Sequence, residues 1–321
     1  MKDFLTIGSV TVDLFLKDSK FGENNLAMFE MGNKYDMQDY FVRIGGSAYN
    51  TAKFFSEFGY LTSLMSCVSD KYYGKLIYGK VKKQKNLSAK LLEINKDIKT
   101  SFSVILLSNL KERIIFKYTC FEKGFHFFKK NLKNHKAICL SSLNGREDVL
   151  KGVFEYVLKS KKFLSFNPGS KDFDFLKNNL NYLKAVDVFT LNNTEASLFS
   201  GIDKKEIFKL LSYFSDKVKV FVMTMGKEGS YVCCNDKMYK CGVYDNTKVE
   251  DMTGAGDAFY SGFVLGYYLY DDIEFALKIG TLNANEVIKE IGSSENVLTF
   301  KKYTSLKEED VNSLKIERIY E

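Results

Sequence analysis

Short apolar runs alternate with longer segments of helical periodicity along the chain. The runs with the length and apolar character of buried strands are FLTIG, LTSLMSCV, AICLSS, FLSFN, VDVFTL and VKVFVMT. Between them, SAYNTAKFFSEFG, REDVLKGVFEYVLKSKK and EIFKLLSYFSDK place apolar residues at helical spacing. Alternating strands and helices predict an α/β fold with a mainly parallel sheet that helices cover on both faces.

Two stretches depart from this alternation. These are residues 10–44 and 99–120, and in the second stretch two strand-like runs flank the turn SNLKE. These stretches predict a small β-sheet beside the main one. MTMGKEGSYVCCNDKMYKCG reads as a further hairpin, and residues 257–292 read as wholly helical. Since no linker, repeat or low-complexity tract interrupts the sequence, we expect one domain over residues 1–321.

The composition adds limits on location and chemistry. The hydrophobic content of 45% is ordinary for a globular protein, and no run approaches the roughly 18 apolar residues of a membrane helix. The N-terminus MKDFLTIGSVTVDLF lacks the pattern of a secretory signal, so we expect a cytoplasmic protein without a membrane partner. The six cysteines form no CxxC pair and only two histidines accompany them, which predicts buried reduced thiols rather than a zinc site.

The charge balance is mildly basic. Lys and Arg outnumber Asp and Glu by 47 to 40, a formal net charge of +7, which suits an anionic ligand such as a nucleotide. The basic clusters KVKKQK and FKKNLKNHK are short and lie beside apolar positions, which is typical of solvated helix faces. We therefore expect no nucleic-acid partner.

The segment TGAGDAF carries the first candidate chemistry. Gly254 and Gly256 permit backbone conformations closed to bulkier residues, and the apolar pattern that starts at Asp257 predicts a helix from there. Unpaired N–H groups and the dipole make a helix N-terminus an anion site. Taken alone, Asp257 fits the dipole as a capping acid.

Two further segments place polar groups where a ligand would lie. In RIGGSAYNTAKFF, Gly45 and Gly46 precede a predicted helix and Asn50 follows one turn into it. Asp13 comes after the first predicted strand, beyond the carboxyl end, where open α/β sheets bind ligands.

Taken together, these motifs resemble those of the ribokinase-like, or PfkB, carbohydrate kinase family. DMTGAGDAF is similar to the family signature DTTGAGDxF, with Met252 as the one departure, and GGSAYNTA is similar to GGxxxNxA. The resemblance covers nearly the whole chain. Its other matches, in chain order, are Asp13, KER ending at Arg113, FNPGSK around Pro168, NNTEA with Asn192 and Glu195, and TMGKEG with Thr224, Gly226 and Gly229.

The resemblance implies a three-layer α/β/α sandwich with a small β lid from about 10–44 and 99–120. It also implies transfer of the γ-phosphoryl group of ATP to a sugar hydroxyl, usually a CH2OH group. Asp257 would be the base that takes the hydroxyl proton, and the N–H groups of Gly254, Ala255 and Gly256 would hold the phosphate charge.

The resemblance also implies ligand contacts. The set implied for the sugar is Asp13, Gly45, Gly46 and Asn50. The set implied for ATP and Mg2+ is Asn192 and Glu195, acting through water, with Thr224, Gly226 and Gly229 along the nucleotide and Asn283 near the adenine. Asp251 resembles the position that helps to hold a monovalent cation, K+, in many members.

Three alternatives stay open. The first is a nucleoside acceptor, as in an adenosine-like kinase, because adenosine kinases share this fold and their glycine motif often reads close to GGSAxNTA. Lid aromatics such as Phe41, Phe102 and Phe116 would then stack on a base, although core packing also accounts for them. The protein is a non-catalytic sugar or nucleotide sensor if it binds without turnover. An apolar outer face of the lid would favour a homodimer through the lid.

Overall fold

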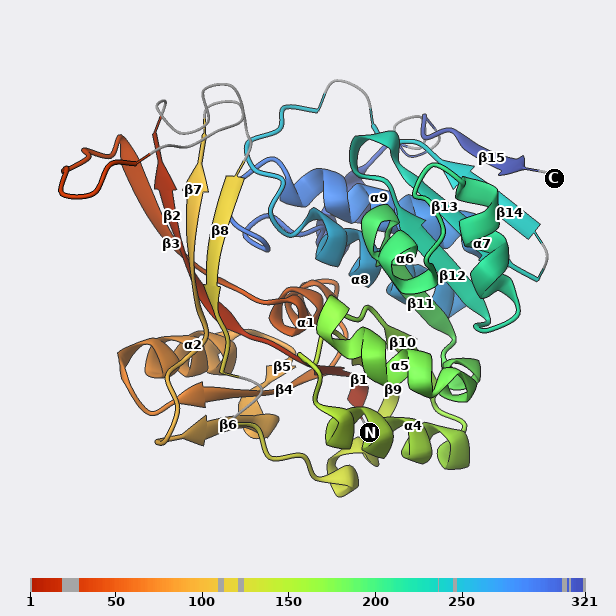
Figure 1. Ribbon diagram of the computed structural model, residues 1–321, viewed down its shortest axis with the longest axis horizontal. Helices are drawn as coiled ribbons and strands as arrows, with labels where there is room; N and C mark the ends of the chain where they lie inside the picture. The colour runs from red at the N-terminus through yellow and green to blue at the C-terminus, as the bar shows by residue number, and fades with distance from the viewer. Residues whose placement is uncertain are drawn as a thin grey trace.

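A large, mostly parallel sheet forms the centre of the molecule (Figure 1). The computed structural model describes residues 2–18, 29–108, 113–120, 124–235, 237–244, 247–307, 311 and 313–319. Strands β13, β14 and β15 are antiparallel to their neighbours, and the others pair in parallel. In spatial order the strands are β15 (Ile316–Ile319), β14 (Lys237–Cys241), β13 (Ser230–Cys234), β12 (Val220–Thr224), β11 (Val188–Asn192), β10 (Phe163–Phe166), β9 (His135–Leu140), β1 (Lys2–Ile7), β4 (Thr62–Ser69) and β5 (Leu87–Ser88), with β6 (Leu92–Asn95) also on β4.

Helices cover both faces of this sheet, as the alternation of elements predicts. Buried side chains of α4, α5, α6 and α7 pack on one face, and those of α1, α8 and α9 on the other. The helices are α1 (Ser47–Glu57), α2 (Tyr72–Lys83), α4 (Glu147–Ser160), α5 (Phe173–Asn178), α6 (Asn193–Ser200), α7 (Ile207–Ser215), α8 (Ala255–Tyr270), α9 (Ile273–Val287) and α10 (Phe300–Ser305). Short 3-10 turns are η1 (Ala89–Leu91), η2 (Lys129–Leu132), η3 (Ser170–Asp172), η4 (Leu180–Ala185) and η5 (Gly226–Glu228).

Two observations within the described residues bear on the expectations from composition. All six cysteines are buried and free. No helix in this part of the chain combines the length and the apolar character that crossing a membrane would need.

A second, smaller sheet stands out from the main body (Figure 1). It has the order β3–β2–β7–β8 and comes from the two stretches in which the sequence predicts it. Residues 109–112, which include most of the predicted SNLKE turn, lie outside the described residues. The strands are β2 (Thr11–Lys17), β3 (Asp39–Gly45), β7 (Phe102–Leu107) and β8 (Arg113–Tyr118).

The two faces of the small sheet differ in character. On the inner face, a cross-strand row of polar residues is followed by an apolar row that packs on Ile291. The polar row is Arg43, Asp13, Ser103 and Lys117, and the apolar row is Phe41, Phe15, Ile105 and Ile115. The outer face carries Val42, Leu14, Val104 and Phe116 in the intervening row, with Phe102 and Tyr118 nearer the body.

The prediction of unbroken helix over residues 257–292 is wrong in three places. The helix α8 begins two residues earlier, at Ala255, because Gly254 takes a φ of 82° and closes the preceding loop. Asp271, with a φ of 51°, ends α8 and separates it from α9. Helix α9 ends at Val287, and the chain then turns through Gly292, whose φ is 122°.

Candidate active site

The loop before α8 and the first turn of that helix present backbone N–H groups and one carboxylate. Gly254 caps the helix, and Asp257 is its third residue. A Cβ atom on Gly254 would lie 2.3 Å from the carbonyl oxygen of Ser293, so only glycine fits there. A Cβ atom on Gly256 would meet nothing within 4 Å. The first N–H groups of the helix have no partner inside it, which makes this turn an anion site.

The turn opens on a cavity of about 290 Å³ at the carboxyl ends of the parallel strands. Asn192 and Thr224 are the last residues of β11 and β12 and lie side by side in register. This is where open α/β sheets bind ligands. The lining residues are Ser47, Arg113, Ser142, Asn167, Pro168, Gly169, Thr190, Asn192, Glu195, Thr224, Met252, Gly254, Gly256 and Asp257.

The side-chain amide of Asn50 joins the two predicted glycine turns, the acceptor turn at Gly45 and Gly46 and the phosphate turn that starts at Gly254. Asn50 Nδ2 donates to Asp257 Oδ2 over 2.7 Å. Ser293 Oγ donates to Asn50 Oδ1 over 3.0 Å, which fixes the orientation of the amide. Gly46, at a φ of 96°, starts α1 so closely against Ser9 that a Cβ atom would lie 2.6 Å from the Ser9 carbonyl oxygen. Two segments about 200 residues apart are thus joined by one hydrogen bond.

Asp13 lies on the inner face of the small sheet, beside Gly45. Its side chain is buried and accepts a hydrogen bond from Thr11 Oγ1 over 2.8 Å. A Cβ atom on Gly45 would lie 2.0 Å from Asp13 Oδ2, so the carboxylate occupies the space that a side chain would fill. Burial raises the pKa of Asp13, while hydrogen bonds from Thr11 and Ser103 and the charge of Lys117 lower it.

Burial also affects two other carboxyl groups of the site. Burial raises the pKa of Asp257, and hydrogen bonds from Asn50 and Ser47 oppose the rise. Burial also raises the pKa of Glu195, and the negative charge of Asp257 adds to that effect. The site therefore concentrates negative charge that a bound cation would offset.

Asn192 and Glu195 form a reciprocal cap at the start of α6. The Glu195 N–H donates to Asn192 Oδ1 over 2.8 Å, and the Asn192 N–H donates to Glu195 Oε2 over 2.9 Å. Both residues also line a neighbouring hollow of about 530 Å³, together with Thr224 and Gly226. Gly229, at a φ of 91°, lines neither cavity; it packs on Cys241, whose carbonyl oxygen a Cβ atom would meet at 2.0 Å.

Asn283 and Asp251 are not brought to these cavities. Asn283 is fully buried between α8 and α9; its Nδ2 donates to the Ala258 carbonyl oxygen over 2.8 Å, and its Oδ1 accepts from the Leu298 N–H. Asp251 is also fully buried; Oδ1 accepts from the Thr253 N–H and hydroxyl. Its Oδ2 accepts from the Gly292 N–H over 3.1 Å. The adenine and cation roles of these two residues stay predictions.

Comparison with known proteins identifies the family. Residues 1–299 match the sequence model of the pfkB family carbohydrate kinases. The chain belongs to this family. A nucleoside kinase of Methanocaldococcus jannaschii is 24% identical over 310 residues, which are 94% of this chain and 95% of that protein. The predicted resemblance is confirmed over nearly the whole chain, and the family consists of phosphotransferases.

Solved structures share the fold. The crystal structure of the Methanocaldococcus jannaschii nucleoside kinase, a member of the ribokinase family, superposes with a TM-score of 0.77 at 22% identity, over 98% of this chain and 99% of that one. The Arabidopsis thaliana ribokinase structure with ribose and ATP has a TM-score of 0.77 at 16% identity, over 94% and 97% of the two chains. The predicted ribokinase-like α/β fold with a separate small sheet is therefore confirmed.

Sequence motifs assign no function to several residues that the structure places at or near the site. Arg113, at the start of β8, reaches the cavity from the small sheet. Asn167 follows β10 and donates to the Thr190 carbonyl oxygen over 2.8 Å; its place before the single proline is the signal that marks it. Ser293 gives no signal, because it only follows the stretch 257–292 that reads as helix and belongs to no motif. Lys117 gives none either, because strand alternation does not say which face of a sheet is covered.

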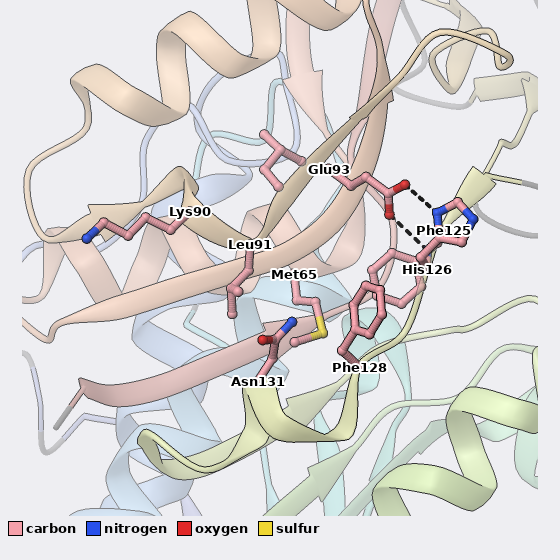
Figure 2. Close-up of a pocket in the computed structure, with 9 residues that line it drawn as sticks. Met65, Lys90, Leu91, Glu93, Phe125, His126, Phe128 and Asn131 are labelled. Atoms are coloured by element: carbon pink, nitrogen blue, oxygen red, sulfur yellow. Dashed lines mark hydrogen bonds and ion pairs between the residues drawn. The ribbon is translucent and has the colours of Figure 1, made fainter.

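The described chain has a second cavity, outside this site. No group of three or more His, Cys, Asp or Glu side chains in the described residues is arranged to hold a metal ion. Figure 2 shows a second cavity, of about 430 Å³, in which His126 and Glu93 are hydrogen-bonded to each other. It shares no lining residue with the cavity of Asp257.

Proposed function

We propose that this protein transfers the γ-phosphoryl group of ATP to a CH2OH hydroxyl of a sugar. The observation that carries the proposal is the position of Asp257, which lines one cavity with the anion-binding turn at Gly254 and with Glu195. Asp257 accepts the proton of the attacking hydroxyl. The N–H groups of Gly254, Ala255 and Gly256 stabilise the charge on the transferred group. Phosphoryl transfer needs such positioning and charge neutralisation more than covalent help.

The acceptor hydroxyls are held on the side of the small sheet. Asp13 and Asn50 offer carboxylate and amide groups to vicinal hydroxyls, and the backbone at Gly45 and Gly46 admits the sugar closely. The hydrogen bond from Asn50 to Asp257 supports this assignment, because it puts the acceptor turn beside the base. In this proposal the small sheet is a lid whose closure excludes water and limits hydrolysis of ATP.

ATP and Mg2+ are held on the other side of the cavity. The donor set fits Mg2+ held through water, since Asn192 and Glu195 offer side-chain oxygen atoms at the cavity and the nearby carboxyl groups leave negative charge to offset. Bound Mg2+ would neutralise phosphate charge. Thr224 and Gly226, which line the neighbouring hollow, would follow the nucleotide. The nucleotide role of Gly229, the adenine role of Asn283 and the K+ role of Asp251 rest on the resemblance alone.

A nucleoside acceptor is the second candidate. One observation favours it: the relative that aligns over 94% of this chain is a nucleoside kinase. Phe41, on the inner face of the small sheet, is the aromatic residue that could stack on a base. Phe102 and Phe116 lie on the outer face, away from Phe41, so the proposed stacking is assigned to Phe41.

Measurement of ADP release against a panel of sugars and nucleosides tests the proposal. We expect release that depends on both ATP and a sugar and that saturates with the sugar. Release with nucleosides alone would replace the sugar by the second candidate. Tight binding without ADP release across the panel would contradict both and would leave a non-catalytic sensor.

The acid limb in the pH profile of kcat/KM is expected to lie at a higher pH than an ordinary aspartate would give. Because burial raises the pKa of Asp257 above that of an ordinary aspartate, activity should fall, as the pH decreases, at a higher pH than 3.8. The charge of Lys117 lowers this pKa, so Lys117→Met should move the limb to still higher pH. Lys99→Met, in the same part of the chain, serves as the control. An unchanged limb in Lys117→Met would contradict the assignment.

We further propose that the lid forms a homodimer through its outer face. Tyr40, Val42 and Phe116 are 66%, 44% and 59% exposed there, and neighbouring exposed apolar side chains of this kind mark protein–protein interfaces. Phe116→Glu should convert a dimer into a monomer in light scattering, while Phe208→Glu, an exposed aromatic position on α7, should not. A monomeric wild-type protein at micromolar concentration would contradict this proposal.

A further inference from the structure

Residues 291–295, which we name the strut, connect the small sheet, α1 and the loop before α8. Each residue of the strut is held by a side chain from another element. The contacts are Arg43 Nε to the Ile291 carbonyl oxygen (3.2 Å), Asp251 Oδ2 to the Gly292 N–H (3.1 Å), Asn50 Oδ1 to Ser293 Oγ (3.0 Å), Lys53 Nζ to the Ser294 carbonyl oxygen (2.7 Å) and Lys80 Nζ to Glu295 Oε1 (3.6 Å).

Lys53 is the unusual member of this set because its ammonium group is buried. The residue is 7% exposed, and its Nζ donates to the Ser294 carbonyl oxygen. A buried lysine is costly unless it is paired, and burial does lower its pKa. The charges of Glu295 and Glu57 act in the opposite direction and favour the ammonium form. The hydrogen bond to the Ser294 carbonyl oxygen is therefore the contact that offsets the burial of the Lys53 ammonium group.

The next residue of the strut touches both halves of the candidate site. Ser293 directs the amide of Asn50 so that its Nδ2 faces Asp257. The Ser293 carbonyl oxygen and Cα lie where a Cβ atom of Gly254 would be, at 2.3 and 2.6 Å. A displacement of Ser293 would therefore disturb the partner of the base and the anion-binding turn together.

We propose that Lys53 is a positioning residue for phosphoryl transfer: by holding Ser294, it fixes Ser293 against both Asn50 and Gly254. The inference rests on the proposed function, since it takes Asp257 as the base. Lys53 lines none of the described cavities and lies three residues beyond Asn50 on the same helix, so it acts through the strut and not on a ligand.

Lys53→Met tests the proposal, because it keeps the length of the side chain and removes the ammonium group. We expect kcat to fall about 10- to 100-fold, as small misplacements of reacting groups do, with the KM for ATP changed less than about threefold. Lys53→Arg should restore most of the activity. Lys80→Met is the matched control: it releases the surface contact of the same strut, and kcat should stay within about twofold.

Hydrogen exchange in the free protein separates this inference from the proposed function, because it needs no acceptor. In Lys53→Met, the amides of 251–257 and 291–295 should exchange about tenfold faster, while those of α4 keep their rates. Unchanged exchange in both segments, or equal losses of kcat in the Met and Arg variants, would overturn the role of Lys53. If Lys53→Met does not fold, Lys53→Arg carries the test. Exchange at wild-type rates in 251–257 and 291–295 of this variant supports the role of Lys53. Faster exchange in α4 as well as in the strut overturns it. Absence of turnover in the wild-type protein would overturn the proposed function alone.

Discussion

Asp257→Asn is expected to lower kcat by about 10³-fold and to leave the fold intact, because asparagine cannot accept the proton of the attacking hydroxyl. The amide oxygen of asparagine can still accept the hydrogen bond from Asn50. Turnover is measured at saturating ATP and acceptor, and folding by the thermal midpoint.

The stability of this variant should rise, and the sign follows from the pKa of Asp257. Burial raises that pKa, so the folded protein favours the protonated carboxyl group, and the ionised form at neutral pH weakens the fold. A neutral amide removes this cost, and the thermal midpoint should increase.

The control is Glu274→Gln, which neutralises the acid in the first turn of α9. It should leave kcat unchanged and should not raise the midpoint, because this acid only complements the helix dipole. Near-wild-type turnover in Asp257→Asn would contradict the role of base. A large loss of stability would instead indicate that the acid serves to cap α8.

Alanine is expected to lower stability at Gly254 but not at Gly256. At Gly254 the backbone has a φ of 82° and a Cβ atom would meet the Ser293 carbonyl oxygen at 2.3 Å. The backbone strain alone costs about 1–3 kcal/mol, and the clash adds to it. We expect Gly254→Ala to lower the denaturant midpoint and to abolish turnover.

Gly256→Ala should be as stable as the wild-type protein or more stable. Its Cβ atom would meet no other atom within 4 Å, and alanine is a better helix former than glycine by about 1 kcal/mol. However, Gly256 lines the cavity, so the methyl group would stand where the phosphoryl group approaches the N–H donors. Loss of one such donor costs about 10² to 10³ in kcat. Wild-type kcat in Gly256→Ala would contradict the position assigned to the phosphate.

The main sheet could be predicted from the sequence because its strands are buried on both faces. The run LTSLMSCV, residues 61–68, matches β4 to within one residue at each end, and every residue of β4 is buried. The glycine-rich turns could also be predicted, because glycine at a positive φ before a helix has few alternatives, and Gly46 and Gly254 both have this conformation.

The features that the sequence did not predict depend on contacts between distant segments. Residues 288–292 continue the helical pattern, but they leave the helix to meet Arg43 and Asp251, from distant segments. Alternation in β7 and β8 predicts two faces without saying which one is covered, so Phe102 and Phe116 could not be separated from Phe41. The buried bond of Lys53 to Ser294 joins positions 241 residues apart, and no local pattern marks it.

Analysis of the reaction product by mass spectrometry tests the central claim most directly. Incubation of the wild-type protein with ATP, Mg2+ and the acceptor selected from the panel should give an acceptor heavier by one phosphoryl group, with one ADP formed for each product molecule. The same incubation with Asp257→Asn should give almost none. ADP formed without any phosphorylated acceptor, or equal product from the two proteins, would contradict the claim that Asp257 directs the phosphoryl group of ATP to an acceptor hydroxyl.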